Sequence, residues 1–428
     1  MTDICTQGFS PNASGTENQA ILQRALDEGG TVLVGQPGVY PLAGTVYIGS
    51  HTTLTFANGA ILKKVDEKGP FCHVVLNKGA LTRRWDCGIA VENLTIQVNG
   101  MDNRLFQVYG LHGQLAFFYV KDLRIEHFRC LDLGKLQYGI HICTFEDVVI
   151  RDVIIKGDKD GVHFGRGKRF LLSGGIFETY DDAVALNAHD YDVGNPEMGW
   201  IEDGVIENCH DTERENGEGV GYFCRILAGA WKDWEKGMMV QRGDTVVSGG
   251  RLYRVKAEVD GREYRSLTPP CHSSGEEVLD GIHWVMSQEE VVYTAGVRNV
   301  IFRNIFCRKV RTTFSVHFDC GPYSRSYYPG AEVPLQQNLT FDGVQILHGE
   351  ETSFLDIYTP MDMLKIAGCS LGRSKIRFHT NKAMEDYGRT RILLNGCSFR
   401  TATAQALVEN HIPGKQVQLV GAGNIAES

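Results

Sequence analysis

Apolar and polar residues alternate in short segments that recur along most of the chain. They share the pattern Val/Phe-x-Asp/Asn-Leu/Val-x-Ile/Phe: VENLTI from Val91, VKDLRI from Val120, FEDVVI from Phe145 and VRNVIF from Val297, with QNLTF from Gln337 as a shortened copy. Alternation with a period of two is typical of a strand with one buried face. Its recurrence predicts a repeat architecture rather than unrelated strands.

A second series of apolar segments lies between the first: YGIHIC from Tyr138, DGVHFG from Asp160, DDAVALN from Asp181 and TFSVHFD from Thr313. His141, His163 and Ala185 follow one another at intervals of 22 residues. Such a constant interval would stack equivalent residues on one sheet, about 4.8 Å apart. The chain is therefore expected to be an all-β, right-handed parallel β-helix, a solenoid of coils of about this length.

Two segments depart from the repeat. NQAILQRALDEGG from Asn18 has helical spacing, with Ser14 and Thr16 as candidate N-caps, and is expected to cap the open end of the stack. The stretch 231–293 holds three of the five tryptophans and two hairpin signals, which indicates a small inserted β module. The expected organisation is cap and coils over 1–230, the module over 231–293, and further coils over 294–428.

Composition and charge narrow the function classes. Lys and Arg total 43 against 52 for Asp and Glu, and this net charge of -9 argues against a nucleic-acid partner. No apolar run approaches the roughly 18 residues of a membrane helix, so no membrane partner is expected. The 12 cysteines form no zinc-type cluster; Cys130, Cys209 and Cys307 are expected to be buried free thiols, and neither metal nor cofactor is expected.

Three aspartates form the main candidate for catalysis. Asp160 and Asp182 are 22 residues apart, so they should occupy equivalent positions on adjacent coils, with Asp181 beside them. Carboxylates packed this closely separate their pKa values, which provides the acid and base that glycoside hydrolysis needs. We expect adjacent coils to reach the separation of about 6.5–9.5 Å of an inverting pair. The alternative is that the aspartates only cap turns.

Further polar residues near these strands are candidates for substrate binding. His163 is the first choice because it would stack with His141 beside the aspartates, and Arg225 is a cation in an apolar strand that needs a partner. Weaker candidates are His317, Tyr138, Asn187, His189 and Asp319. Several aromatic residues could be exposed and stack on sugar rings: Trp200, Trp231, Trp234, Tyr327 and Tyr328. For any single residue of these groups, a framework role is the alternative.

At these residues the sequence resembles the pectate-lyase-like β-helix superfamily, and within it the polygalacturonases of glycoside hydrolase family 28. DKDG from Asp158 and YDDA from Tyr180 are similar in order and spacing to the family's Asn-Thr-Asp and Gly-Asp-Asp motifs. The resemblance implies inverting hydrolysis by Asp160, Asp181 and Asp182. Three features depart from it: Asp158-Lys159 replaces Asn-Thr, Gly-His-Gly is missing, and Arg-Ile-Lys is only echoed at Arg225. These departures do not favour a pectic substrate.

The inserted stretch separately resembles small β modules of phage tail and tail-fibre proteins, through GGRLYRV from Gly249 and SGEEVLDGIHW from Ser274. Three hypotheses follow. The first is hydrolysis of a glycosidic bond in an oligo- or polysaccharide. The second is β-elimination by a polysaccharide lyase, in which the aspartates could hold calcium. The third is a tailspike-like protein that binds or depolymerises a glycan, as a monomer or homotrimer.

The start of the chain, MTDICTQGFS, has neither a basic region nor an apolar stretch of signal-peptide type. As written, the sequence predicts a cytoplasmic protein. A secreted or virion-associated protein would give the same pattern if the sequence were truncated or phage-derived.

Overall fold

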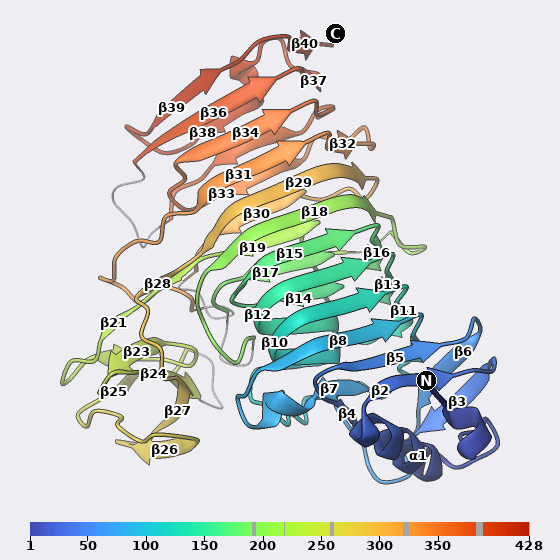
Figure 1. Cartoon of the computed structure of the whole chain (residues 1–428). Helices are drawn as coiled ribbons and strands as arrows, with labels where there is room; N and C mark the ends of the chain where they lie inside the picture. Colours follow the sequence, from blue (N-terminus) through green and yellow to red (C-terminus); the bar gives the residue numbers. More distant parts are fainter. Residues whose placement is uncertain (191–193, 218, 257–260, 320–324, 382–387, 428) are drawn as a thin grey trace.

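Three series of parallel strands wind into an elongated stack of coils in the computed structural model, with the N-terminus at one end and the C-terminus at the other (Figure 1). The structure describes residues 1–190, 194–217, 219–256, 261–319, 325–381 and 388–427. Among these residues, 29 strands join into one continuous parallel system. We call its three faces sheet A, sheet B and sheet C. The expected right-handed parallel β-helix is confirmed.

Each face is one series of strands, and long bent strands belong to two faces. Sheet A comprises β4 (Val46–Ile48), β7 (Val75–Asn77), β10 (Gly113–Glu126), β12 (Tyr138–Arg151), β14 (Val162–Phe164), β17 (Val184–Asn187), β19 (Cys224–Leu227), β30 (Phe314–His317), β33 (Ser353–Ile357), β35 (Lys375–Phe378) and β38 (Val408–Asn410). Sheet B comprises β1 (Thr2–Asp3), β2 (Gly30–Val34), β5 (Thr52–Phe56), β8 (Asp86–Glu92), the later parts of β10 and β12, β15 (Gly167–Ser173), β18 (Ile201–Asp211), β29 (Val297–Cys307), β31 (Gln337–Asp342), β34 (Met363–Ala367), β36 (Arg389–Asn395) and β39 (Gln416–Val420). Sheet C comprises β3 (Gly38–Leu42), β6 (Ala60–Lys64), β9 (Thr95–Gln97), β11 (Arg129–Leu133), β13 (Ile154–Gly157), β16 (Ile176–Thr179), the ends of β18 and β29, and β32 (Gln345–Ile346). Beyond β32, the strands β37 (Ser398–Phe399) and β40 (Ile425–Ala426) form a separate pair, which isolated bridges through Ser370 connect to this face.

The register of sheet A agrees with the interval of 22 residues found in the sequence. His141 of β12 pairs with His163 of β14, which pairs in turn with Ala185 of β17. The same row continues through Arg225 of β19 and Ser315 of β30. Because side chains alternate between the two faces of a strand, every residue in this row points away from the apolar interior.

The Asp/Asn position of the repeated motif has a structural cause. Asp122, Asp147 and Asn299 all have positive φ, between 51° and 59°, at a row of positions within sheet B that the strand pairing skips. Asp and Asn tolerate the left-handed region better than most residues. Asn338 and Asn299 also share a side-chain hydrogen bond of 2.9 Å, which extends the ladder along the stack.

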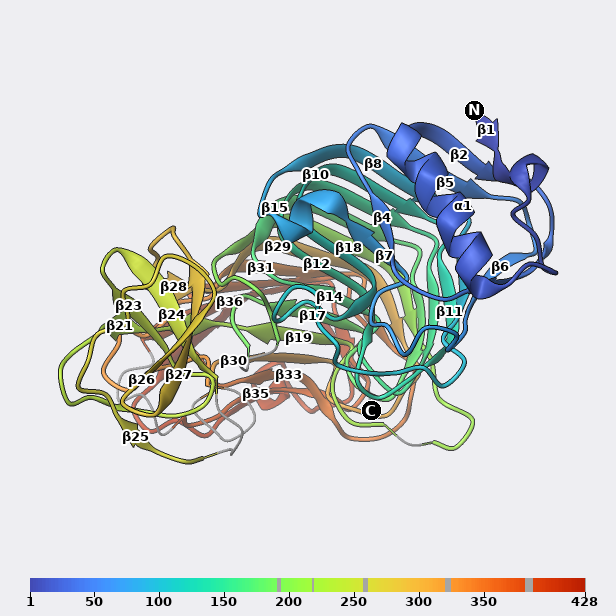
Figure 2. The same cartoon turned by 90° about the horizontal axis from the view of Figure 1, so that it is seen from below.

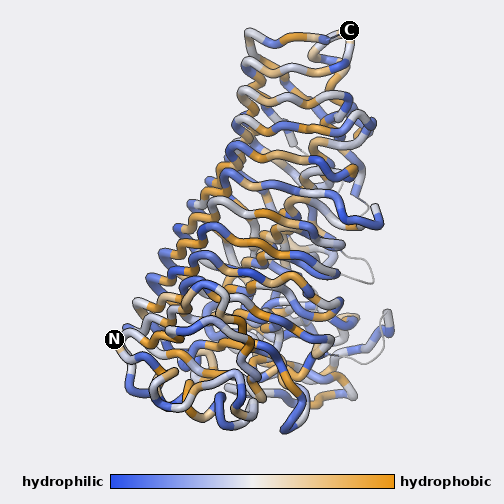
Figure 3. The backbone as a smooth tube through the Cα atoms, turned by 90° about the vertical axis from the view of Figure 1, so that its right-hand side faces the viewer, coloured by the Kyte–Doolittle hydropathy of each residue, from blue (hydrophilic) through white to orange (hydrophobic). Residues whose placement is uncertain are grey.

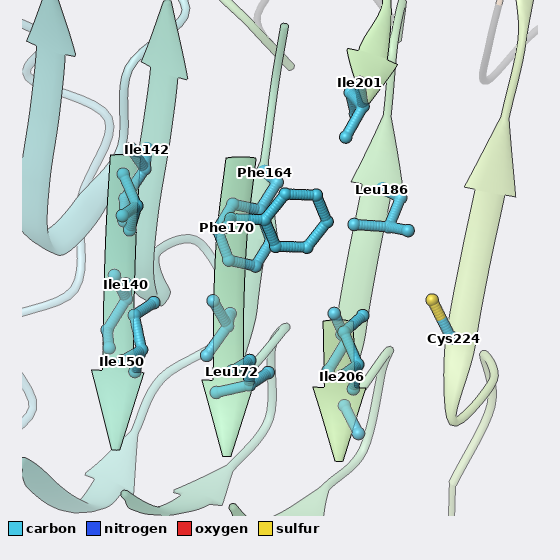
Figure 4. Close-up of a cluster of buried hydrophobic side chains, with 14 of the residues drawn as sticks. Ile140, Ile142, Ile150, Phe164, Phe170, Leu172, Leu186, Ile201, Ile206 and Cys224 are labelled. Atoms are coloured by element: carbon cyan, nitrogen blue, oxygen red, sulfur yellow. The ribbon is translucent and has the colours of Figure 1, made fainter. Parts of the chain in front are cut away.

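Inward-facing side chains of successive coils stack into one long apolar core. Figure 4 shows part of it, where Ile140, Phe164, Leu186 and Cys224 occupy neighbouring strands of the stack. Apolar and polar positions alternate along the tube in Figure 3, as expected for strands with one buried face. Close packing of these layers is the main source of stability for such a fold.

Helix α1 (Gly15–Glu28) packs at the N-terminal end of the stack, against β3 and β4 (Figure 2). Ser14 and Glu17 form a reciprocal capping box at its first turn. The helix therefore begins three residues before the expected Asn18, and it buries Leu22, Ala25 and Leu26. This arrangement confirms the predicted N-terminal cap.

The inserted segment forms its own small sheets beside the stack (Figures 1 and 2). Their strands are β20 (Gly229–Ala230), β21 (Lys232–Asp233), β22 (Met239–Val240), β23 (Thr245–Ser248), β24 (Arg251–Lys256), β25 (Tyr264–Arg265), β26 (Glu276–Leu279), β27 (Ile282–Gln288) and β28 (Thr294–Ala295). Five of them form one sheet in the order β21, β23, β24, β27, β26. A separate apolar cluster that includes Val240, Tyr253 and Trp284 fills its interior.

Cys130, Cys209 and Cys307 are buried and free, as predicted. No helix within the described ranges is long and apolar enough to cross a membrane.

Candidate functional site

The three predicted aspartates lie at the start of two adjacent strands of sheet A. Asp160 precedes β14, and Asp181 and Asp182 precede β17. The Gly139 amide donates to the Asp160 carbonyl and the Gly161 amide to the Asp182 carbonyl, both at 3.0 Å. Asp160 and Asp182 therefore occupy equivalent positions on neighbouring coils.

Carboxylate oxygens of all three residues lie within 4.8 Å of one another. We call this group the aspartate cluster. Asp160 and Asp182 are almost fully buried, whereas the Asp181 side chain is 26% exposed. Because one oxygen of each carboxyl group lies this close to the others, the nearest approach of the three groups is shorter than the separation of about 6.5–9.5 Å expected of an inverting pair.

Asp182 has the environment of a proton donor. Burial raises its pKa well above the usual range for an aspartate, and the nearby charges of Asp181 and Asp160 raise it further. Its Oδ1 accepts a hydrogen bond of 2.9 Å from the Tyr222 amide. Gly221, with φ of 72°, passes so close that a Cβ there would lie 2.6 Å from this oxygen. The glycine thus makes room for the carboxyl group.

Asp160 and Asp181 share a cation that the motif analysis did not assign. The Lys159 ammonium lies 3.6 Å from Asp160 Oδ1 and contacts Asp181 Oδ2. Asp160 Oδ2 is also 3.0 Å from His163 Nδ1, which is positioned to donate to it. Lys159 holds the place between the carboxylates that a calcium ion would take. The residues present therefore do not fit a calcium site.

A buried arginine holds the backbone of the cluster, and sequence reasoning missed it. Arg311 donates to the Asp181 carbonyl at 2.9 Å and the Val220 carbonyl at 3.1 Å. It also forms a two-pronged ion pair with the buried Asp211, at 2.7 and 3.0 Å. Lys309 donates to the Thr179 carbonyl nearby, and burial, with Arg311, lowers its pKa to about 8.

The two central histidines, His141 and His163, are neutral and meet edge-on. Tyr138 lies parallel to the His163 ring at 4.2 Å, and the His141 ring is 4.7 Å from that of His163. Burial lowers the pKa of both well below the usual range, with Arg225 adding to the effect at His163. His141 accepts from the His112 amide at 3.2 Å, so its Nε2 donates to Asn195 Oδ1 at 2.9 Å.

Three further predicted residues, Arg225, His317 and Asn187, are linked to one another through Asp190 on the following coils. Arg225 points outward from β19, 3.7 Å from Asp190 and 3.5 Å from His317 Nε2. Burial, with Arg225, lowers the pKa of His317 to about 3. Asn187 donates to Asp190 at 2.7 Å, which links it to the same group.

His189 and Asp319 are engaged elsewhere. His189 Nε2 is 2.8 Å from the Thr245 hydroxyl of the inserted segment, so it supports the contact between that segment and the stack. The Asp319 backbone bonds with Ser326 and Tyr327 in the loop after β30.

The expectation of exposed aromatic residues is partly wrong. Trp231 and Tyr327 are each only 2% exposed, because they pack where the inserted segment joins the stack. Trp85, which sequence reasoning did not single out, is 41% exposed.

No protein-family model and no curated protein sequence matches the chain. Among solved structures, the tailspike protein of E. coli bacteriophage HK620 in complex with pentasaccharide is similar with a TM-score of 0.54 and 12% identity. The alignment covers 98% of this chain and 64% of the tailspike chain, so this chain spans less than two thirds of that protein. The family 28 exopolygalacturonase of Yersinia enterocolitica matches with a TM-score of 0.48 and 12% identity, over 100% and 78% of the two chains. The comparison with the tailspike agrees with the observed register: the chain is a right-handed parallel β-helix.

Proposed function

We propose that the protein hydrolyses a glycosidic bond in an oligo- or polysaccharide. The aspartate cluster carries this proposal, because it combines a buried carboxyl group of raised pKa with two further carboxylates within 4.8 Å. Glycoside hydrolysis needs one carboxylic acid to protonate the leaving oxygen and one carboxylate to assist the attack. The HK620 tailspike, whose fold is similar, was solved in complex with pentasaccharide, which supports a glycan as the ligand.

The contacts of the cluster suggest a role for each aspartate. Asp182 is the general acid, because burial and the neighbouring carboxylates raise its pKa and so favour its protonated form. Asp160 is the base, since His163 Nδ1 and Lys159 orient its two oxygens. Asp181 is more exposed and tied to Lys159, so it is suited to holding the attacking water or a sugar hydroxyl.

Inversion remains the proposed stereochemical outcome despite the short separation. Asp160 and Asp181 are both held by Lys159, and Asp160 also by His163. A carboxylate whose negative charge is paired with an ammonium group is a weaker nucleophile, so we propose that it acts through water. The anomer formed first, followed by NMR immediately after mixing, tests this step: a product of retained configuration would contradict it.

A screen of defined oligosaccharides, with product analysis by mass spectrometry, tests the function itself. Asp182→Asn and Asp160→Asn should each lower turnover by about 10²- to 10⁴-fold, the usual contribution of general acid–base catalysis. Asp152→Asn is the matched control, because its side chain is 60% exposed on a neighbouring coil. If both cluster variants keep full activity on a confirmed substrate, the assignment fails.

β-Elimination is the second candidate, because Lys159 places a possible base among the aspartates. An elimination product contains a new carbon–carbon double bond, which absorbs near the ultraviolet edge. An absorbance increase during product formation would favour the lyase over the hydrolase. Binding of a glycan without turnover would instead favour a tailspike-like binding protein.

A further inference from the structure

A polar cavity of about 580 Å³ lies where the inserted segment meets the coil stack. Arg83, Tyr119, Thr144 and Glu197 line it from the stack, and Gln288 and Glu290 from the inserted segment. A second cavity of about 230 Å³ shares Trp85, Thr144, Arg166 and Glu290 with the first and extends to Trp200. The larger volume falls within the range of about 300–1,000 Å³ typical of small-molecule sites. We call the two cavities together the junction groove.

The bottom of the junction groove is a preformed hydrogen-bond network around Glu197, a residue only 1% exposed. Its Oε1 accepts from the Tyr119 hydroxyl and its Oε2 from the Thr144 hydroxyl, each at 2.7 Å. Arg83 and Arg166 lie 3.4 and 3.6 Å from the same carboxylate. Fully bonded side chains of this kind hold a binding surface rigid before any ligand arrives.

The backbone at this network is in an unfavourable conformation. Thr144 has φ of 52° and Tyr119 has φ of 59°, at the same bend of adjacent coils. A β-branched residue in the left-handed region is a genuine outlier, and such strain concentrates at functional sites. Most of the other described non-glycine residues with positive φ are Asp or Asn, for example Asp122 and Asn299 in another row of the coils, and none of the others is β-branched. The hydroxyl that reaches Glu197 gives a reason for threonine at this bend.

Two sides of the groove are held together across the junction. Arg83 donates to the Ser287 carbonyl at 2.5 Å, and Arg166 pairs with Glu290 of the inserted segment. Trp85 presents a ring that is 41% exposed and contacts Tyr119 edge-on at 5.3 Å. An exposed flat ring combined with rigid polar groups matches the apolar face and hydroxyl groups of a sugar, and Trp200 adds a half-buried ring at the other end of the groove.

The charges of the groove favour an uncharged ligand. Two arginines and three glutamates line the larger cavity, and the arginines already face Glu197 and Glu290. An acidic sugar would meet at least as many negative as positive groups. We therefore propose that the junction groove is a second glycan site, distinct from the aspartate cluster, which binds a neutral oligosaccharide between Trp85 and Trp200.

Fluorine NMR of protein labelled with 5-fluorotryptophan tests this proposal without any enzymatic readout. The chain has five tryptophans, and Trp85→Phe and Trp200→Phe assign the two relevant signals. Cellohexaose, maltohexaose and chitohexaose serve as neutral probes, and trigalacturonic acid as the acidic comparison. At least one neutral probe should shift both signals, and the shift should persist in Asp182→Asn.

Arg166→Ala should weaken the binding of that probe by about tenfold or more, whereas Leu131→Ala, at an exposed apolar position on β11, should not. Ser274→Tyr, which narrows the groove from the inserted segment, gives a second variant should Arg166→Ala fold poorly.

Three outcomes would overturn the proposal: no neutral probe moves either signal, the shifts vanish in Asp182→Asn, or only trigalacturonic acid binds. The proposed hydrolase activity fails separately, if groove binding is seen but no oligosaccharide is cleaved.

Discussion

Asp182 and Glu197 are both buried carboxyl groups beside neighbouring coils of the stack, but their surroundings are opposite. Asp182 faces two further carboxylates and one backbone donor, and burial with these charges raises its pKa. Glu197 faces two hydroxyl donors and two arginines. A buried carboxylate surrounded by hydrogen-bond donors stabilises its neighbours. A buried carboxyl group surrounded by like charge has a raised pKa instead, so it retains a proton that it can donate to a substrate. The same kind of side chain is thus suited to acid catalysis at Asp182 and to holding a binding surface rigid at Glu197.

The largest expected effect on stability comes from removing Arg311, which holds the backbone of the aspartate cluster. Arg311→Ala leaves the buried Asp211 without its partner and frees the Asp181 carbonyl, so we expect a loss of about 3–5 kcal/mol in the free energy of unfolding. Urea titration followed by circular dichroism measures it. Arg303→Ala is the control, because its side chain is 44% exposed and its ion pairs should contribute less than about 1 kcal/mol. Equal losses in the two variants would mean that Arg311 does not support the cluster.

Glu197→Gln should have the next largest effect. The amide group replaces an oxygen that accepts from Thr144 or Tyr119, and it leaves a buried donor facing another donor. We expect a loss of about 1–3 kcal/mol in the free energy of unfolding, measured by urea titration. Glu289→Gln, an exposed neighbour that lines the same cavity, should change stability little. If Glu197→Gln is as stable as the parent protein, the Glu197 carboxylate does not hold this network together.

Asp182→Asn should have the opposite effect on stability. A carboxyl group whose pKa is raised by folding contributes stability below its unfolded-state pKa, and that stability is lost as pH rises through the folded-state value. Asparagine removes this loss, so the melting temperature of the variant should exceed that of the parent increasingly toward alkaline pH. Thermal scans of both proteins over the pH range measure the difference. A variant that is less stable at alkaline pH would contradict the raised pKa.

Asp182→Asn is expected to gain stability at alkaline pH and to lose activity. Active-site groups are often held at the expense of stability. In the parent protein, turnover should fall as pH rises through the pKa of Asp182, because the leaving oxygen then lacks its proton donor. A pH–rate profile without a basic limb would point to another acid.

Periodicity along the sequence was sufficient to align Asp160 with Asp182, because a constant coil length places equivalent residues on neighbouring strands. The same repeat was sufficient to predict the β-helix, and the helical spacing after Asn18 was sufficient to predict its cap. The partners of the cluster were beyond this reasoning: Arg311 reaches Asp181 from another coil, 130 residues further along the chain. Lys159 was noticed only as a departure from a family motif, although it contacts two of the aspartates.

The junction groove could not be predicted from the sequence at all. Its residues come from separate segments of the stack and from the inserted segment, and Arg83 and Ser287 are 204 residues apart. The prediction that Trp231 and Tyr327 are exposed was wrong for the same reason, because both side chains are buried where the inserted segment packs on the stack. Local patterns specify coils, whereas contacts between distant segments specify which side chains meet.

Thr144 gives the smallest and most specific test of the comparison. Thr144→Val keeps the shape but removes the hydroxyl that reaches Glu197, so we expect a loss of about 1 kcal/mol in urea and a weaker shift of the Trp85 signal on ligand binding. Thr144→Ser keeps the hydroxyl and removes the β-branch at a positive φ, so its stability should stay within about 0.5 kcal/mol of the parent. If both variants behave alike, the bond to Glu197 does not account for a threonine in the left-handed region. If only valine is destabilised, the strain at this bend is retained for the hydroxyl, and the groove is built around Glu197 as the network indicates.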